Sequence, residues 1–146
     1  MSLVYFDTSA LLKLCLPETG SQLAARLWNG ASAVLTSRIT DAEGRSALAA
    51  GLRAGLVDQE QWRQALGNWV SLCPALYQVE LSPAVSALAA ELIERYPLRG
   101  GAAIQVASAA GFGPSVLVAS WDRPVRLAAA AQGLTVLPPQ PATAVG

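Results

Sequence analysis

The chain has 146 residues, of which 53% are hydrophobic and only 14% charged, and this composition argues against a disordered protein. Ten basic and ten acidic side chains cancel, so a net charge of zero predicts no global attraction to nucleic acid and leaves room only for a local basic patch. Histidine is absent, which excludes Ser-His-Asp and Cys-His nucleophilic pairs, histidine-ligated zinc and histidine acid–base catalysis within the chain.

Strand-like and helix-like segments alternate along the chain. Short β-rich runs bounded by turn residues indicate strands, and longer segments with apolar residues three or four positions apart indicate helices. In chain order we predict a strand at 3–6, helices from about 9 and over 21–28, a strand at 33–36, helices over 39–52 and 58–72, a strand at 77–81, helices over 83–96 and 102–110, a strand at 116–119, a helix over 124–132 and a strand at 134–137. This order predicts an α/β fold with a mostly parallel sheet of four or five strands between helices. We expect a single domain over residues 1–138 and a flexible C-terminal tail over 139–146.

The first strand ends at a lone acid, Asp7. A continuous apolar run is typical of a strand buried on both faces, and open α/β sheets bind ligands at the carboxyl ends of such strands. A carboxylate at this position can anchor a metal ion or a polar substrate. It can equally well cap the helix that starts near Ser9, and the residue alone does not decide between the two roles.

Two further acids follow predicted strands, Glu43 and Asp122. Because parallel strands all point one way, the turns after them share one edge, and we expect the three acids to converge there. Converging carboxylates repel unless a cation neutralises them, and oxygen ligands without histidine or cysteine favour Mg²⁺ or Mn²⁺ over zinc. Each acid also has a structural alternative: Thr40 and Glu43 match a capping box, and Asp122 can cap the helix that begins near Pro124.

Five short segments stand in a recognisable order, at residues 5–11 (YFDTSAL), 42–48 (AEGRSAL), 98–100 (LRG), 107–108 (AS) and 120–123 (SWDR). Together they resemble the PIN-domain family, and their spacing resembles that of the small VapC-type toxins of bacterial toxin–antitoxin pairs. The resemblance covers essentially the whole chain up to about Pro138. It implies a PIN-like three-layer sandwich and an endoribonuclease that hydrolyses phosphodiester bonds with Mg²⁺ or Mn²⁺.

The resemblance also implies roles for individual residues. Acids at the positions of Asp7, Glu43 and Asp122 help hold the metal in the family. The supporting hydroxyl groups would be those of Thr8, Ser9 and Ser120.

One position departs from the family pattern. The family usually has an aspartate just after the Leu-Arg-Gly turn and a histidine three residues later, where this chain has Ala102 and Gln105. With three carboxylates in place of four, we expect weaker metal binding and nuclease activity that is weakened or lost. Gln105 could supply a neutral contact, and Glu91 or Glu94 could reach in from the preceding helix.

The expected partners are an RNA substrate, a cognate antitoxin and a second copy of the chain in a homodimer. Three arginines near the acidic edge could hold RNA phosphates or an acidic antitoxin segment, and could equally well be ordinary surface residues: Arg45, Arg99 and Arg123. The alternative to a nuclease is a non-catalytic PIN-like module that binds RNA or an antitoxin by shape.

The compartment is predicted from two features. Cys15 and Cys73 stand alone in apolar surroundings, as in proteins of a reducing compartment. The apolar runs are too short for a membrane span and none resembles a secretory signal, so we expect a cytoplasmic protein.

Overall fold

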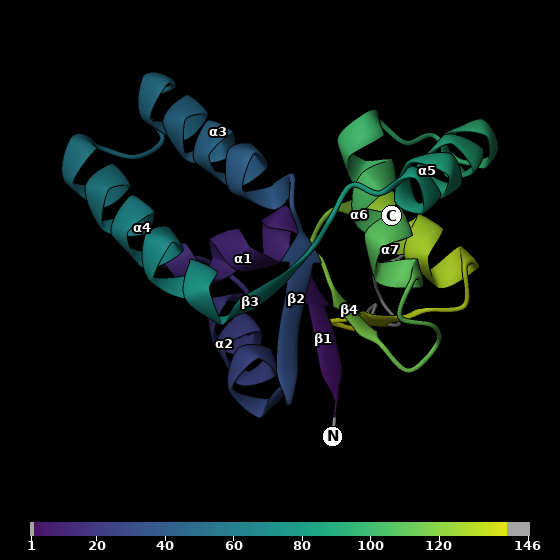
Figure 1. The fold of residues 1–146 in the computed structure, drawn as a ribbon. Coiled ribbons are helices and arrows are strands. Elements are labelled where there is room, and N and C mark those ends of the chain that lie inside the picture. The colour runs from purple at the N-terminus through teal and green to yellow at the C-terminus, as the bar shows by residue number, and fades with distance from the viewer. Residues whose placement is uncertain (1, 140–146) are drawn as a thin grey trace.

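A computed structural model describes residues 2–139, and its centre is a five-stranded sheet (Figure 1). The strands lie in the order β3-β2-β1-β4-β5, and all four neighbouring pairs are parallel. Their bounds are β1 Leu3–Phe6, β2 Ala33–Ser37, β3 Leu76–Val79, β4 Leu117–Ala119 and β5 Thr135–Leu137. The prediction of a parallel sheet is therefore confirmed, with β1 at its centre.

Helices cover both faces of the sheet. In chain order they are α1 Thr8–Cys15, α2 Ser21–Gly30, α3 Thr40–Arg53, α4 Gln59–Leu72, the short 3₁₀ turn η1 Cys73–Ala75, α5 Pro83–Arg95, α6 Gly100–Ala110 and α7 Arg123–Ala131. In Figure 1, α1 to α4 lie on one side of the sheet and α5 to α7 on the other. This is the three-layer sandwich that the alternation of strands and helices predicts.

The central strand divides the core into two apolar clusters. Val4 and Phe6 face the cluster shared with α1, α3 and α4, while Tyr5 faces the cluster shared with α5, α6 and α7. Side chains alternate between the faces of a strand, so β1 must be apolar at every position to serve both clusters. The chain turns polar only at Asp7, where the strand has ended.

Two element bounds differ from the prediction in an informative way. The third strand ends at Val79 instead of residue 81, because Ser82 already caps α5 by accepting from the backbone N–H of Val85. Helix α6 begins at Gly100 instead of residue 102. Glycine is tolerated at this first helical position, because the entropic cost of glycine applies to the interior of a helix.

Helices α3 and α4 form an antiparallel pair that extends from the sheet (Figure 1). They meet at Gly44, where an added Cβ would overlap the indole ring of Trp69. Trp69 is buried and donates its Nε1–H to Asp41 at 2.9 Å. Within residues 2–139 no helix is long and apolar enough to cross a membrane. The predicted tail lies outside the described residues, apart from Pro139.

Candidate metal and RNA site

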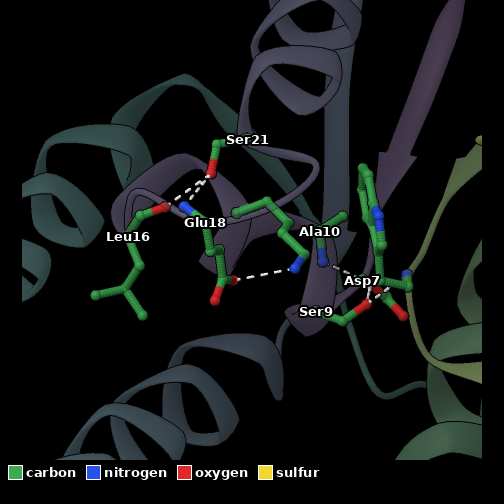
Figure 2. A network of polar contacts seen from close by, with 8 residues as sticks. Asp7, Ser9, Ala10, Leu16, Glu18 and Ser21 are labelled. Atoms are coloured by element: carbon green, nitrogen blue, oxygen red, sulfur yellow. Dashed lines mark hydrogen bonds and ion pairs between the residues drawn. The ribbon is translucent and has the colours of Figure 1, made fainter. Parts of the chain in front are cut away.

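Asp7 lies at the carboxyl end of β1 and is 2% exposed. Its Oδ1 accepts the Ala10 backbone N–H at 2.9 Å, so the capping role is confirmed. The same oxygen accepts the Ser9 hydroxyl at 2.6 Å, and Oδ2 accepts the Ser120 hydroxyl at 2.5 Å. Figure 2 shows Asp7, Ser9 and Ala10 together at the start of α1. Both carboxylate oxygens are therefore fixed in position by the protein.

Burial raises the pKa of Asp7 to about 6, against an ordinary value of 3.8. The hydrogen bonds from Ser120, Ser9 and Ala10 lower that pKa, and the neighbouring charge of Asp122 raises it. Desolvation is the largest effect, because burial removes the carboxylate from the water that solvates its charged form. The result is a carboxylate that is costly to ionise without a cation beside it.

Two serines join the turn after β1 to the turn after β4. Ser9 Oγ donates to Asp7 and accepts the backbone N–H of Trp121 at 2.9 Å, and Ser120 Oγ donates to Asp7 and accepts the Asp122 N–H at 3.1 Å. Each hydroxyl has a single proton. Because the hydroxyl oxygen faces a backbone N–H and accepts from it, the proton points the other way and is donated to Asp7. Asp122 lies at the N-cap of α7, where its Oδ1 accepts the Val125 N–H at 3.3 Å.

Glu43 lies in the first turn of α3 and is half-buried. Its Oε1 accepts the Thr8 hydroxyl at 2.8 Å and the Gln105 Nε2 at 2.7 Å. The predicted capping box of Thr40 and Glu43 is wrong, because Ile39 is the N-cap and no side chain caps α3. Both side chains turn toward Gln105 and away from their own helix terminus.

The three acids line one edge of the sheet without forming a single cluster. Asp122 is linked to Asp7 through hydrogen bonds of both residues to the Ser120 hydroxyl. Glu43 is hydrogen-bonded instead to Thr8, the residue after Asp7. No group of three or more histidine, cysteine or acidic side chains in residues 2–139 is arranged to hold a metal ion. The donors that are present are carboxylate and hydroxyl oxygens, which suit a hard divalent cation.

Two polar residues of this edge make contacts that have no signal in the sequence. Gln105 is 3% exposed and contacts four polar side chains: Tyr5, Thr8, Thr40 and Glu43. Arg126, half-buried on α7, donates from Nη1 to the Ser120 carbonyl at 2.7 Å and from Nη2 to the Pro138 carbonyl at 2.5 Å. Arg126 thus ties the turn that carries Ser120 to the end of the sheet.

The arginines predicted to bind partners differ in their surroundings. Arg45 is paired with Asp41 at 2.9 Å, one helical turn away. Arg99, at the N-cap of α6, and Arg123, at the start of α7, are exposed. The acids predicted as substitutes for a fourth carboxylate, Glu91 and Glu94, lie at exposed positions of α5.

Trp121 lies beside Asp122 and is half-buried rather than free in solvent. The Nζ of Lys13 lies 5.8 Å from the centroid of its ring, and an added Cβ on Gly20 would come within 2.8 Å of its Nε1. The indole therefore packs against the connection between α1 and α2.

Comparison with known proteins gives a consistent result. The PIN domain family matches residues 4–120, and the match ends just before Asp122. Ribonuclease VapC45 of Mycobacterium tuberculosis is 42% identical over 141 residues, 96% of this chain and 98% of the relative. Two solved structures share the fold. Mycobacterium tuberculosis VapC20, described as a sarcin-ricin loop cleaving toxin, is 19% identical with a TM-score of 0.66, over 90% of this chain and 96% of that one. The VapBC-5 toxin–antitoxin protein of the same species is 15% identical with a TM-score of 0.61, over 93% and 98%.

Proposed function

This chain belongs to the PIN-domain family as an endoribonuclease of the VapC toxin type, and from that premise we propose that Asp7, Glu43 and Asp122 hold its catalytic metal ion. PIN-domain ribonucleases of this type depend on divalent metals, and Mg²⁺ or Mn²⁺ suits the oxygen donors present here. The substrate that we propose is RNA, cleaved at a phosphodiester bond.

The observation that carries the proposal is the buried carboxylate of Asp7. It is 2% exposed, its pKa is raised to about 6, and among the described residues no lysine or arginine donates a hydrogen bond to it. Buried charges in proteins are normally paired or bound to metal. Perturbed carboxyl groups of this kind gather at functional sites, because catalysis and ligand binding need groups whose ionisation is shifted by their surroundings.

The bound cation would activate a water molecule and stabilise charge on the phosphate. The chain's own residues hold the ligands: Ser9 and Ser120 fix both oxygens of Asp7, and Thr8 fixes one oxygen of Glu43. Carboxylates and hydroxyl groups alone are sufficient for this chemistry, in agreement with a chain that has no histidine.

We further propose that nuclease activity is weaker than a four-acid site would give. The first turn of α6 carries Gly100, Gly101 and Ala102, and the sequence has no acid between Glu94 and Asp122. One negative charge fewer leaves a divalent cation less completely neutralised, so metal binding weakens.

A ribonuclease assay with Mg²⁺ or Mn²⁺ tests both proposals on three proteins: the natural chain, Asp7→Ala and Ala102→Asp. We expect slow cleavage that Asp7→Ala abolishes and Ala102→Asp accelerates. Rapid cleavage by the natural chain that Ala102→Asp does not improve would refute the weakening. Cleavage that persists in Asp7→Ala would refute the assignment of the metal site.

The alternative function is a non-catalytic module that binds RNA or an antitoxin. The alanine at 102, with no three-acid group assembled in the described part of the chain, favours this alternative. Titration with Mn²⁺ separates the two, because a ligand that binds only the folded state raises the midpoint of thermal unfolding. A midpoint that does not move at millimolar Mn²⁺ supports the binding module.

We also propose an antitoxin partner, a homodimer and a cytoplasmic location. The antitoxin is suggested by the toxin–antitoxin systems among the structural relatives. The exposed Arg99 and Arg123 stand beside the acidic edge and could contact RNA phosphates or acidic antitoxin residues. Co-expression with a short neighbouring gene, followed by size-exclusion chromatography with light scattering, tests the partner and the dimer together.

A further inference from the structure

We propose that Gln105 is a positioning residue that sets the carboxylate of Glu43 for metal binding. The inference rests on the proposed metal site, since it concerns how one ligand of that site is held. Gln105 lies in the middle of α6, on the opposite side of the sheet from α3, and its side chain reaches across the sheet edge to Glu43.

The amide of Gln105 uses both of its N–H protons. Its Nε2 lies 2.7 Å from Glu43 Oε1, 2.9 Å from Thr40 Oγ1 and 3.2 Å from Thr8 Oγ1. Two amide protons serve the two shorter contacts, and the Thr8 hydroxyl donates its own proton to Glu43. Glu43 Oε1 therefore accepts two donors that come from different elements.

The Gln105 amide is anchored on its other side by Tyr5. The buried Tyr5 hydroxyl donates to Gln105 Oε1 at 2.5 Å, which leaves only Nε2 to face Glu43. A flipped amide would place its carbonyl oxygen against the carboxylate and would leave the Thr40 contact without its donor. The carboxylate of Glu43, which can only accept, thus sets the direction in which Gln105 donates, and β1, through Tyr5, holds the amide in that orientation.

The second oxygen of Glu43 is in a different position. Within residues 2–139 no hydrogen bond reaches Oε2, which lies against the backbone at the start of α6, 2.5 Å from where a Cβ on Gly101 would stand. The carboxylate therefore has one oxygen held by the protein and one without a partner. A ligand presented in this way has its orientation set before the metal binds, and partners of this kind tune metal affinity.

The test is calorimetric titration with Mn²⁺, which needs no substrate. In Gln105→Met the side chain keeps its length but loses the carbonyl oxygen and the NH₂ group of the amide, and we expect Mn²⁺ affinity to fall about 10- to 100-fold. Gln105→His retains an N–H that can face Glu43, and we expect it to restore part of the affinity. Val106→Ala is the matched control: Val106 is the next residue of α6, fully buried and apolar, so its truncation loosens packing without touching Glu43.

Tyr5→Phe provides a second variant if Gln105→Met does not fold. It removes only the hydroxyl that fixes the amide, and we expect about tenfold weaker Mn²⁺ binding. Equal affinity of the natural chain, Gln105→Met and Tyr5→Phe would overturn the role of Gln105 while leaving the proposed function intact. Failure of the natural chain to bind Mn²⁺ or to cleave RNA would overturn the proposed function, and this inference with it.

Discussion

Asp7→Asn is expected to stabilise the metal-free protein while abolishing metal-dependent cleavage. A pKa raised from 3.8 to about 6 corresponds to a cost of about 3 kcal/mol for carrying a charged Asp7 in the folded chain well above pH 6. The asparagine removes that cost. It also replaces one acceptor by an NH₂ group facing Ser120, which forfeits about 1 kcal/mol. The expected net gain is about 2 kcal/mol at pH 8.

The gain has a defined pH dependence. The folded-state pKa of Asp7 is raised, so its contribution to the stability of the natural chain is fully present below pH 3.8 and is lost as the pH rises through about 6. Asp7→Asn lacks this term, so its advantage over the natural chain disappears on acidification. Urea unfolding of both proteins in EDTA, at several pH values between 4 and 8, measures the difference directly.

Asp58→Asn is the matched control. Asp58 caps α4 through the same kind of contact, its Oδ1 accepting the Gln61 N–H at 2.8 Å, yet it is exposed. Asparagine caps helices as well as aspartate does, so we expect this substitution to change stability little. The reasoning is refuted if Asp7→Asn is less stable than the natural chain at pH 8, or if its advantage is the same at pH 4 and pH 8.

Three further substitutions test the packing around the site. Gly44→Ala should destabilise the chain by about 1–3 kcal/mol, because the added Cβ would overlap the ring of Trp69. Gly67→Ala in α4, where an added Cβ would meet no atom within 4 Å, should stabilise the chain by about 0.5–1 kcal/mol. Urea unfolding distinguishes these opposite signs. Gly101→Ala should displace Glu43, because the added Cβ would lie 2.5 Å from its Oε2, and should weaken Mn²⁺ binding about 10-fold or more. The circular dichroism spectrum should stay unchanged. An unchanged calorimetric affinity for Mn²⁺ would show that Glu43 is not a ligand.

The fold could be predicted from local sequence because each element carries its own signal. β1 is apolar at four successive positions and ends at an acid, and this pattern predicts a strand that is buried on both faces and carries Asp7 at its carboxyl end. The strand order does not follow from such patterns. That β4 pairs with β1, across more than 110 residues, depends on the crossover through α5 and α6.

The polar network was predictable only in part. Ser9 and Ser120 each lie two residues from an acid, Asp7 and Asp122, and the family resemblance implied their supporting role. The Gln105 amide meets Tyr5 and Glu43 at sequence separations of 100 and 62 residues, and a glutamine among alanines carries no signal of those contacts. The capping box of Thr40 and Glu43 was mispredicted for the same reason, since tertiary donors compete with the helix terminus for those side chains.

Capping and metal binding are compatible roles for Asp7. A helix cap needs one oxygen facing the helix terminus, and Asp58 shows that this chain caps a helix with an exposed aspartate. Asp7 also caps through Oδ1, yet it is buried and holds Oδ2 against Ser120 in the turn after β4. The cap therefore explains one oxygen, and it does not explain why the chain retains a buried carboxylate whose ionisation costs about 3 kcal/mol. A divalent cation at this edge would remove that cost, because it stabilises the charged form that burial disfavours.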